Sequence, residues 1–407
     1  MHAPICGPKQ DDWNMNKFRE EVRAWLITNC PDSARGKGEP VTVGSKLPIK
    51  DPLLLEWRHK LGEKGWTIPT WPREYGGGGL TPEECNVLIE ELQLIEARLP
   101  LVGQGVSMVG PTLLEFGTEE QKLRHIPRIA MGDVQWCQGY SEPGAGSDLA
   151  SLQTRATDQG DYFEINGQKT WTSGAQFADW IFMLVRTDTD VPKHEGISFM
   201  LVDMNQAGIK VKPMPLISGT SAFCDTFFDN ARAERADLIG QLNNGWGIGK
   251  RLLQYERSGH GGLTASNARR AMPEPDLVAT AKQYLGVEAD GKINDAASRD
   301  QVIRFQMNAR SFKSTQRRAR AENASGQAMG DVTSIFKLYG SFLTRDSADL
   351  QCALMGSQGY GWEGDGFSKT ELEWTRNFLS FRANTIYGGT SEIQANIIAK
   401  RVLGLPE

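Results

Sequence analysis

The sequence is poor in the residues that mark metal sites, disulfide scaffolds and nucleic-acid binding. Its 407 residues include five histidines, none in an H-x-x-x-H or H-x-E spacing, so no catalytic metal is expected. The six cysteines form no C-x-x-C pair, which argues against a disulfide framework or zinc site and favours a reducing compartment. With 45 Lys and Arg against 50 Asp and Glu, the net charge of -5 gives no field that would attract nucleic acid.

Long apolar runs are also missing. No stretch approaches the roughly 18 apolar residues that a membrane span requires. The first residues, MHAP, lack a basic segment followed by an apolar one. The sequence therefore predicts a soluble, unexported, cytoplasmic protein without a membrane span.

The first third of the chain has helical periodicity. Apolar residues share one helix face over 18–26 and again over 87–95. Thr118 and, three residues later, Gln121 form a capping-box pattern. This pattern predicts a further helix that starts just after Gly117.

Helical patterns return in the last third. They begin at Trp246 and include apolar stripes over 332–342 and 393–397. Residues 271–300 are rich in Pro, Gly, Asp and Ala. We expect them to form a loop or an irregular insertion between helices, without a catalytic role.

The middle of the chain, residues 133–240, has short β-prone runs separated by turn residues. Residues 166–167, Asn-Gly, lie between two such runs and predict a hairpin, because Asn-Gly tolerates the positive φ angles of a type I′ turn. The apolar runs 181–185 and 197–202 predict two more strands. The order helices, strands, helices indicates an α+β fold.

Three segments match the sequence motifs of a known family. Residues 138–148 read QGYSEPGAGSD, a block of small and hydroxylated residues that lets backbone approach a flat ligand. Residues 166–174, NGQKTWTSG, place an aromatic and hydroxyls on a strand, and residues 386–394 read IYGGTSEIQ. Together they resemble the acyl-CoA dehydrogenase family, with its S/T-E-P-x-A-G-S-D signature and Y-E-G-T-S-x-I-Q loop. Residues 74–77 and 117–121 also match, so the resemblance spans nearly the whole chain.

The resemblance implies a fold and its domain limits. They are an N-terminal helical domain over 1–132, a middle β-barrel or sandwich domain over 133–240, and a C-terminal four-helix bundle over 241–407. Among the branches of the family, the motif wording is most similar to the large subunit of pimeloyl-CoA dehydrogenase.

The resemblance also implies a reaction and its base. In this family a carboxylate removes the α-proton of an acyl-CoA thioester while the β-hydrogen leaves as hydride to N5 of FAD. The usual base is the Glu of Y-E-G-T, and Gly388 stands in its place. Some branches carry the base on a helix directly before an Arg, as Glu256 and Arg257 do here. The resemblance thus assigns Glu256 as the base, the backbone N–H of Gly388 as the enolate-oxygen donor, and Arg257 as a substrate-binding residue.

Flavin contacts are implied at six positions that match the family in residue type: Ser141, Ser147, Trp171, Ser173, Thr390 and Glu392. Two further family elements do not match. The R-x-x-F-G element, by which a neighbouring subunit holds the flavin diphosphate, is absent after Glu256, and Q-x-x-G-G appears only as residues 353–357, without its glutamine. Either a partner subunit or other residues replace this grip. Arg269 and Arg270 are candidates, although an exposed helix end is the favoured interpretation of both.

The leading hypothesis is an oxidoreductase of fatty or carboxylic acid catabolism that acts on a CH–CH bond. It would form 2-enoyl-CoA, pass electrons to an electron-transfer flavoprotein, and assemble as a homo- or hetero-tetramer. A second hypothesis is a non-catalytic partner subunit that binds flavin within a hetero-oligomer. A third is oxidase, flavin monooxygenase or desulfinase chemistry on the same fold.

Overall fold

A computed structural model describes residues 10–36, 41, 43–47, 49–98, 101, 103–258, 275–324 and 332–406. The chain divides into two compact units. The first consists of Met1–Pro213 with Phe223–Met272, and the second of Met214–Ala222 with Pro273–Glu407.

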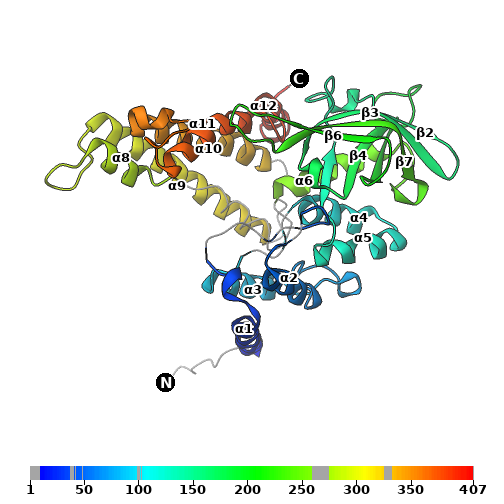
Figure 1. Cartoon of the computed structure of the whole chain (residues 1–407), viewed down its shortest axis with the longest axis horizontal. Coiled ribbons are helices and arrows are strands. Elements are labelled where there is room, and N and C mark those ends of the chain that lie inside the picture. Colours follow the sequence, from blue (N-terminus) through cyan, green and yellow to red (C-terminus); the bar gives the residue numbers. More distant parts are fainter. Residues whose placement is uncertain are drawn as a thin grey trace. The chain divides into compact units, whose positions relative to one another are not determined.

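Helices make up the N-terminal part of the first unit (Figure 1): α1 Gln10–Asn29, α2 Pro52–Glu63, α3 Pro82–Leu94, α4 Gly110–Phe116 and α5 Glu119–Met131. At the start of α5 the Gln121 N–H donates to Thr118 Oγ1 at 3.3 Å, and the Thr118 N–H donates to Gln121 Oε1 at 2.9 Å. The predicted capping box is confirmed. The periodicity over 18–26 and 87–95 is also confirmed, because α1 and α3 bury those apolar faces in one core.

An eight-stranded sheet follows: β1 Trp136–Gly139, β2 Arg155–Asp158, β3 Tyr162–Ser173, β4 Trp180–Arg186, β5 Ile197–Asp203, β6 Ile209–Met214, β7 Phe223–Glu234 and β8 Leu238–Ile239. The strand order is β6-β7-β3-β2-β4-β5-β8, and β1 pairs in parallel with β4. The predicted strands over 181–185 and 197–202 are confirmed as β4 and β5, which pair antiparallel.

The hairpin predicted at residues 166–167 is wrong. β3 continues through them, and the β2–β3 hairpin turns instead around Gly160, whose φ is +87°. At Gly167 the strand bulges against β7, and a Cβ on this glycine would lie 2.7 Å from Thr154 Cα. The glycine therefore permits a close approach of two backbones, and pairing with β7 on both sides of it keeps the strand from reversing.

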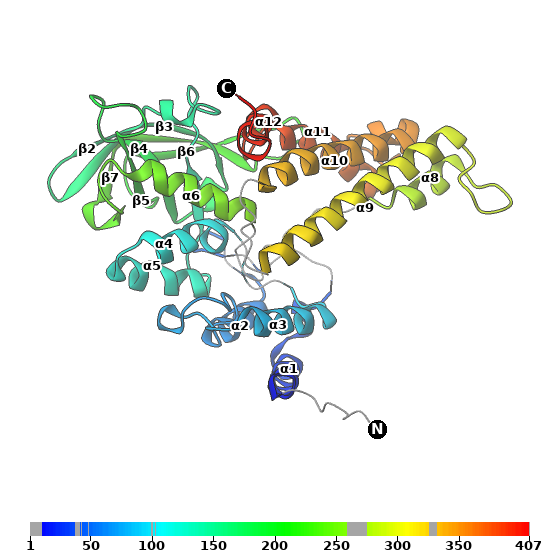
Figure 2. The ribbon, with the colours of Figure 1, turned by 180° about the vertical axis from the view of Figure 1, so that it is seen from behind.

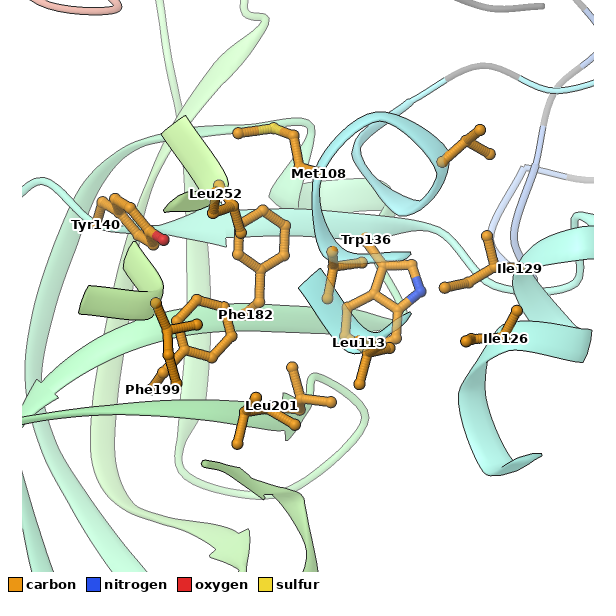
Figure 3. Close-up of a cluster of buried hydrophobic side chains, with 14 of the residues drawn as sticks. Met108, Leu113, Ile126, Ile129, Trp136, Tyr140, Phe182, Phe199, Leu201 and Leu252 are labelled. Atoms are coloured by element: carbon orange, nitrogen blue, oxygen red, sulfur yellow. The ribbon is translucent and has the colours of Figure 1, made fainter. Parts of the chain in front are cut away.

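One core joins the sheet to the helices of the first unit. Viewed from behind, α6 (Gly245–Ser258) runs along the sheet beside β5, with α4 next to it (Figure 2). Figure 3 shows the buried side chains that strands and helices contribute: Met108, Leu113, Ile126, Ile129, Trp136, Tyr140, Phe182, Phe199, Leu201 and Leu252. This packing fixes the end of β1, from which the QGYSEPGAGSD loop emerges.

The second unit is helical, with α10 packed against the other helices: α8 Leu277–Leu285, α9 Ala296–Ala324, α10 Val332–Met355, α11 Lys369–Ser380 and α12 Ser391–Ile397. The helices predicted over 332–342 and 393–397 are confirmed as α10 and α12. Short 3-10 or π segments occur in both units: η1 Asp32–Ala34, η2 Arg73–Tyr75, η3 Gly105–Val109, η4 Leu149–Ser151, η5 Ala175–Phe177, η6 Arg235–Asp237, η8 Gly356–Tyr360, η9 Phe381–Thr385 and η10 Ile398–Val402.

The expectation of a loop or irregular insertion over 271–300 is wrong for much of its length. α8 forms here because the Asp276 side chain caps it, accepting from the Ala279 N–H at 2.9 Å, and because Leu277 and Ala281 are buried. Within the described residues of this stretch, 275–300, the Gly- and Asp-rich turn between α8 and α9 is irregular. Tertiary burial thus overrode a composition typical of turns.

A helical N-terminal part, a central sheet and a helical C-terminal region confirm the α+β class. The expected domain limits at 132 and 240 stay a prediction. No helix in the described part of the chain is long and apolar enough to cross a membrane.

Candidate active site

The QGYSEPGAGSD loop leaves β1 and lies against β3. The Thr170 N–H donates to the Ser141 carbonyl at 2.9 Å, which brings Ser141 next to the end of β3. Glu142 and Ala145 close a turn with two reciprocal backbone bonds of 3.0 Å. Within this turn and just after it the loop borders open space, since a Cβ added at Gly144 or Gly146 would meet no atom within 4 Å. A flat or anionic ligand can therefore approach this backbone closely.

A buried ion pair anchors the start of this loop to β3. Lys169 is 0% exposed and its Nζ lies 2.7 Å from Glu142 Oε1 and 3.1 Å from the Tyr140 carbonyl. The carboxylate also accepts from the backbone N–H groups of Gln153, at 2.6 Å, and Thr154, at 2.9 Å. Both charges are thus paired with each other and hydrogen-bonded to backbone groups, as buried charges need to be.

Burial shifts the titration of both partners of this pair. Burial lowers the pKa of Lys169 to about 8, against the attraction of Glu142. Burial also acts to raise the pKa of Glu142, but the charge of Lys169 and the backbone donors outweigh it and hold that pKa below its ordinary value.

Two cationic side chains, one from β4 and one from the β4–β5 connection, hold the end of this loop and the residues that follow it. The buried Arg186 guanidinium donates to the carbonyls of Ala150, at 2.6 Å, and Leu152, at 3.3 Å. Lys193 Nζ reaches Asp148 at 2.8 Å on the solvent side. Ser147 lies at this end of the loop and is exposed, so its hydroxyl is accessible to a ligand.

Trp171 is the most unusual residue of this region. It has φ +58°, a value that bulky residues rarely adopt, and its side chain is 55% exposed. Its ring meets Phe223 edge-on, with the ring centroids 5.9 Å apart. Backbone strain of this kind concentrates at functional sites. An exposed, strained aromatic beside Ser141 fits a planar cofactor.

Ser173 closes β3 and is half-buried, paired in register with Phe223. The structure therefore gathers Ser141, Trp171 and Ser173 at one end of β3, with Ser147 on the same loop as Ser141. These four predicted flavin residues belong to the first unit. Their role stays a prediction.

The second unit holds the glycine loop between η9 and α12. Gly388 and Gly389 have φ +65° and +90°. Gln394 Nε2 lies 3.3 Å from the Gly388 carbonyl oxygen and 3.5 Å from that of Gly389. A Cβ at Gly389 would lie 2.4 Å from this nitrogen, so the tether requires glycine there.

The tether determines where the N–H groups of the loop point. In a planar trans peptide the carbonyl of one residue and the N–H of the next point in opposite directions. Gln394 therefore turns the N–H groups of Gly389 and Thr390 away from itself. Within the described part of the chain, no hydrogen bond uses the backbone N–H of Gly388, Gly389 or Thr390. These donors are available to a ligand oxygen.

Thr390 and Glu392 begin α12. Thr390 Oγ1 accepts from the Ile393 N–H at 3.3 Å and so caps the helix, while Glu392 is exposed in its first turn. Helix capping accounts for a threonine at position 390 and leaves its hydroxyl proton free to donate. A flavin contact at either residue stays a prediction.

Glu256 and Arg257 directly precede Ser258, the last residue of α6, and their side chains lie outside the described residues. The preceding turn is well anchored. Arg251 Nε lies 2.9 Å from Glu115 of α4, and the Tyr255 hydroxyl donates to the same carboxylate. Burial and then this bond raise the pKa of Tyr255 to about 12. Arg269 and Arg270 also lie outside the described residues.

The residues present fit FAD. An exposed tryptophan suits the isoalloxazine ring, serine hydroxyls and an open glycine-rich backbone suit polar groups and phosphate, and unused N–H groups suit an oxyanion. In the described ranges no cluster of three His, Cys, Asp or Glu side chains could hold a metal ion.

Sequence reasoning missed the roles of Lys169 and Gln394. Both are nearly fully buried polar residues, although their types are usually exposed. For Lys169, the only local indication was a lysine within a β-prone run. No local pattern predicted that the Gln394 side chain turns back onto its own loop.

Comparison with known proteins supports the same assignment over the whole chain. Family models for the N-terminal, middle and C-terminal domains of acyl-CoA dehydrogenase match residues 15–133, 137–231 and 243–403. The chain is 35% identical to acyl-CoA dehydrogenase IpdE1 of Mycobacterium tuberculosis over 398 residues, covering 97% of this chain and 98% of the relative.

Solved structures agree. One titled Tcur3481-Tcur3483 steroid ACAD matches with a TM-score of 0.73 and 31% identity, and the ChsE4-ChsE5 complex from Mycobacterium tuberculosis with 0.70 and 27%, each covering 100% of both chains. The matched domains, the near full-length identity and the flavin-compatible loop together lead to one conclusion: the chain belongs to the FAD-dependent acyl-CoA dehydrogenase family.

Proposed function

We propose that this protein converts an acyl-CoA thioester to the 2-enoyl-CoA, with Glu256 as the base that removes the α-proton. Bound FAD supplies the acceptor for the β-hydride at N5. The loop residue at the usual base position is Gly388, which has no side chain, so the carboxylate has to come from another segment. Glu256, directly before Arg257, is the residue that matches the alternative family pattern.

The observation that carries the proposal is the set of unused N–H groups on the glycine loop. Proton removal places negative charge on the thioester oxygen, and preorganised backbone donors stabilise such charge without reorganising. The Gly388 N–H is the proposed donor. The base can be lost from the loop without loss of this donor, because the donor belongs to the backbone.

The test is anaerobic titration with a panel of acyl-CoA thioesters while the bleaching of the flavin absorbance is followed. Removal of a general base slows its step by about 10²–10⁴-fold, so Glu256→Gln should bleach slower by that factor. Glu120→Gln, an exposed carboxylate on α5, is the matched control and should bleach at the parent rate. Bleaching of Glu256→Gln at the parent rate would exclude Glu256 as the base.

A second variant tests whether the base can return to the loop. Gly388→Glu in the Glu256→Gln background restores a carboxylate at the position that most of the family uses. We expect a partial recovery of bleaching. Recovery should be incomplete because Glu at φ +65° is strained.

For the acyl group we propose a polycyclic one. The solved structure with 31% identity over the whole chain is titled a steroid ACAD. The panel therefore compares steroid acyl-CoA thioesters with straight-chain and dicarboxylic ones. Faster bleaching by a straight-chain thioester would contradict this substrate class.

We further propose that a second acyl-CoA dehydrogenase chain completes the flavin grip and that an electron-transfer flavoprotein accepts the electrons. The support is the missing R-x-x-F-G and Q-x-x-G-G elements, together with two solved structures whose titles each name two proteins. If the chain expressed alone is yellow, homogeneous and active, the hetero-oligomer is excluded and a homo-tetramer takes its place.

A further inference from the structure

Trp171 has a conformation that its own side chain disfavours, so its neighbours must impose it. A bulky residue at φ +58° persists only where the surrounding structure over-determines it. The β3 residues on either side of Trp171 make the contacts that can impose this conformation.

On its N-terminal side the anchor is the Glu142–Lys169 ion pair. Lys169 is 0% exposed, and its ammonium is bound at 2.7 Å by Glu142 and at 3.1 Å by the Tyr140 carbonyl. The Glu142 carboxylate is itself held by two backbone N–H groups. The side chain of Lys169 thus has one direction available to it, and the backbone at residue 169 is fixed accordingly.

On its C-terminal side the anchor is Thr172, which is fully buried. Its hydroxyl lies 2.8 Å from the Cys224 carbonyl and 2.8 Å from Thr226 Oγ1, both on β7. The register confirms a bulge between the two anchors. Lys169 pairs with Thr226 and Thr172 with Cys224, so two β3 residues stand opposite the single β7 residue between these partners.

The bulge turns Trp171 outward. Lys169, Thr170 and Thr172 are buried, whereas Trp171 between them is exposed. A bulge re-aims one side chain while the strand continues on both sides. The same strand segment is tied to the QGYSEPGAGSD loop by the bond from the Thr170 N–H to the Ser141 carbonyl.

We propose that Glu142 and Lys169 form a positioning pair that holds Trp171 in its left-handed conformation and so presents its ring, beside Ser141, to the isoalloxazine ring of FAD. The inference rests on the proposed contact between Trp171 and FAD. Neither residue of the pair touches the reacting atoms. A buried ion pair is weak evidence for stability, but its hydrogen bonds fix directions that apolar contacts would leave free.

The experiment is a double-mutant cycle on the complete oligomer with FAD. One arm is the neutral pair Glu142→Gln/Lys169→Met, which removes both buried charges together so that neither is left unpaired. The other arm is Trp171→Phe, and the third protein combines all three substitutions. The measured quantities are the FAD dissociation constant and the visible absorbance and circular dichroism of bound flavin.

We expect the neutral pair and Trp171→Phe each to weaken FAD binding by about tenfold and to alter the flavin spectrum in the same way. The combined protein should be no weaker than either, because residues that act through one another are not additive. If the two effects on the dissociation constant multiply, the pair does not act through Trp171 and the proposal fails. A merely structural role would lower the melting temperature without changing the spectrum, and that result also overturns it.

Trp171→Phe by itself distinguishes a failure of the flavin placement from a failure of the positioning role. If this variant leaves FAD affinity and the flavin spectrum unchanged, the proposed flavin placement is wrong and the positioning role falls with it. If Trp171→Phe has its effect and the neutral pair has none, only the positioning role is wrong.

Lys193→Met provides a matched control. The Lys193–Asp148 pair holds the same loop at 2.8 Å, but both side chains are exposed, at 49% and 60%. Exposed pairs contribute little. This variant should leave the FAD dissociation constant within about twofold of the parent, and a tenfold change would show that any ion pair on the loop has the effect attributed to the buried one.

Discussion

Two segments of this protein, one in each unit, hold backbone in the left-handed region, and they do so by opposite means. At the end of β3, Trp171 takes φ +58° with a bulky side chain, between a buried ion pair and a buried threonine. In the loop before α12, Gly388 and Gly389 take φ +65° and +90° without strain, and one glutamine orients them. The first arrangement presents a side chain, whereas the second presents backbone N–H groups.

The difference has a physical reason. A bulky side chain is presented from a left-handed position only if its backbone is held in a strained conformation, which requires strong anchors on both sides. Backbone donors can be aimed by glycine, which adopts positive φ at little cost, and then need only a light tether. The two segments should therefore respond differently to mutation.

The largest expected effect is on the strongly anchored segment. Glu142→Gln leaves the Lys169 ammonium buried without its counter-charge, which should lower the free energy of unfolding by about 3–5 kcal/mol. Denaturant unfolding of the FAD-free protein measures it. Lys193→Met breaks an exposed pair on the same loop and should change stability by less than about 1 kcal/mol. Similar losses in the two variants would contradict the distinction between buried and exposed anchors.

The next effect is on the lightly tethered loop. Gln394→Leu keeps the volume but removes the amide that holds the Gly388 and Gly389 carbonyls. We expect kcat to fall by about 10–100-fold with little change in KM, because the loop that carries the Gly388 N–H loses the contacts that fix its conformation. Steady-state kinetics with an artificial acceptor provide the measurement. The control is Asn396→Ala, on the exposed side of α12. A rise in KM alone would show that Gln394 serves substrate binding instead.

The third effect is a pH dependence that only the first segment should show. Burial lowers the pKa of Lys169 to about 8 from its ordinary 10.5. Between these values the unfolded chain keeps the proton that the folded protein has released, so the free energy of unfolding should rise with pH. The slope for one proton is about 1.4 kcal/mol per pH unit.

This slope is measured as the difference between the parent and Glu142→Gln/Lys169→Met across pH 8 to 10.5. Glu142 is also absent from the variant, but its pKa lies below its ordinary value, far from this window. The other titrating groups are shared by the two proteins and cancel. Below pH 8 the difference should become flat. Parallel stability curves over the whole range would mean that Lys169 keeps an ordinary pKa in the folded state.

The smallest effect compares strain at the two segments directly. At position 171, the Gly variant should be more stable than the Ala variant by about 1 kcal/mol, because Ala keeps the Cβ that the left-handed conformation disfavours. At position 389, Gly→Ala should lower stability by about 1–2 kcal/mol, since the new Cβ also meets Gln394. Thermal unfolding of the FAD-free variants decides both. Equal stability of the Gly and Ala variants at 171 would show that the backbone relaxes there.

The sequence predicted well wherever a local rule decides the structure. The capping box at Thr118, the apolar strands β4 and β5, and the amphipathic α10 follow from hydrogen bonding and periodicity within a few residues. The motif wording likewise indicated the family and its cofactor, which the family models bear out.

Only the tertiary structure decided the features that depend on distant partners. Residues 166–167 have the local chemistry of a hairpin, yet pairing with β7 makes them a bulge. Lys169 is an ordinary lysine until Glu142, 27 residues earlier, meets it in the interior. The conformation of Trp171, which we propose that this ion pair and Thr172 impose, is of the same kind, because a backbone angle that the residue itself disfavours can be imposed only by contacts that the local sequence does not contain.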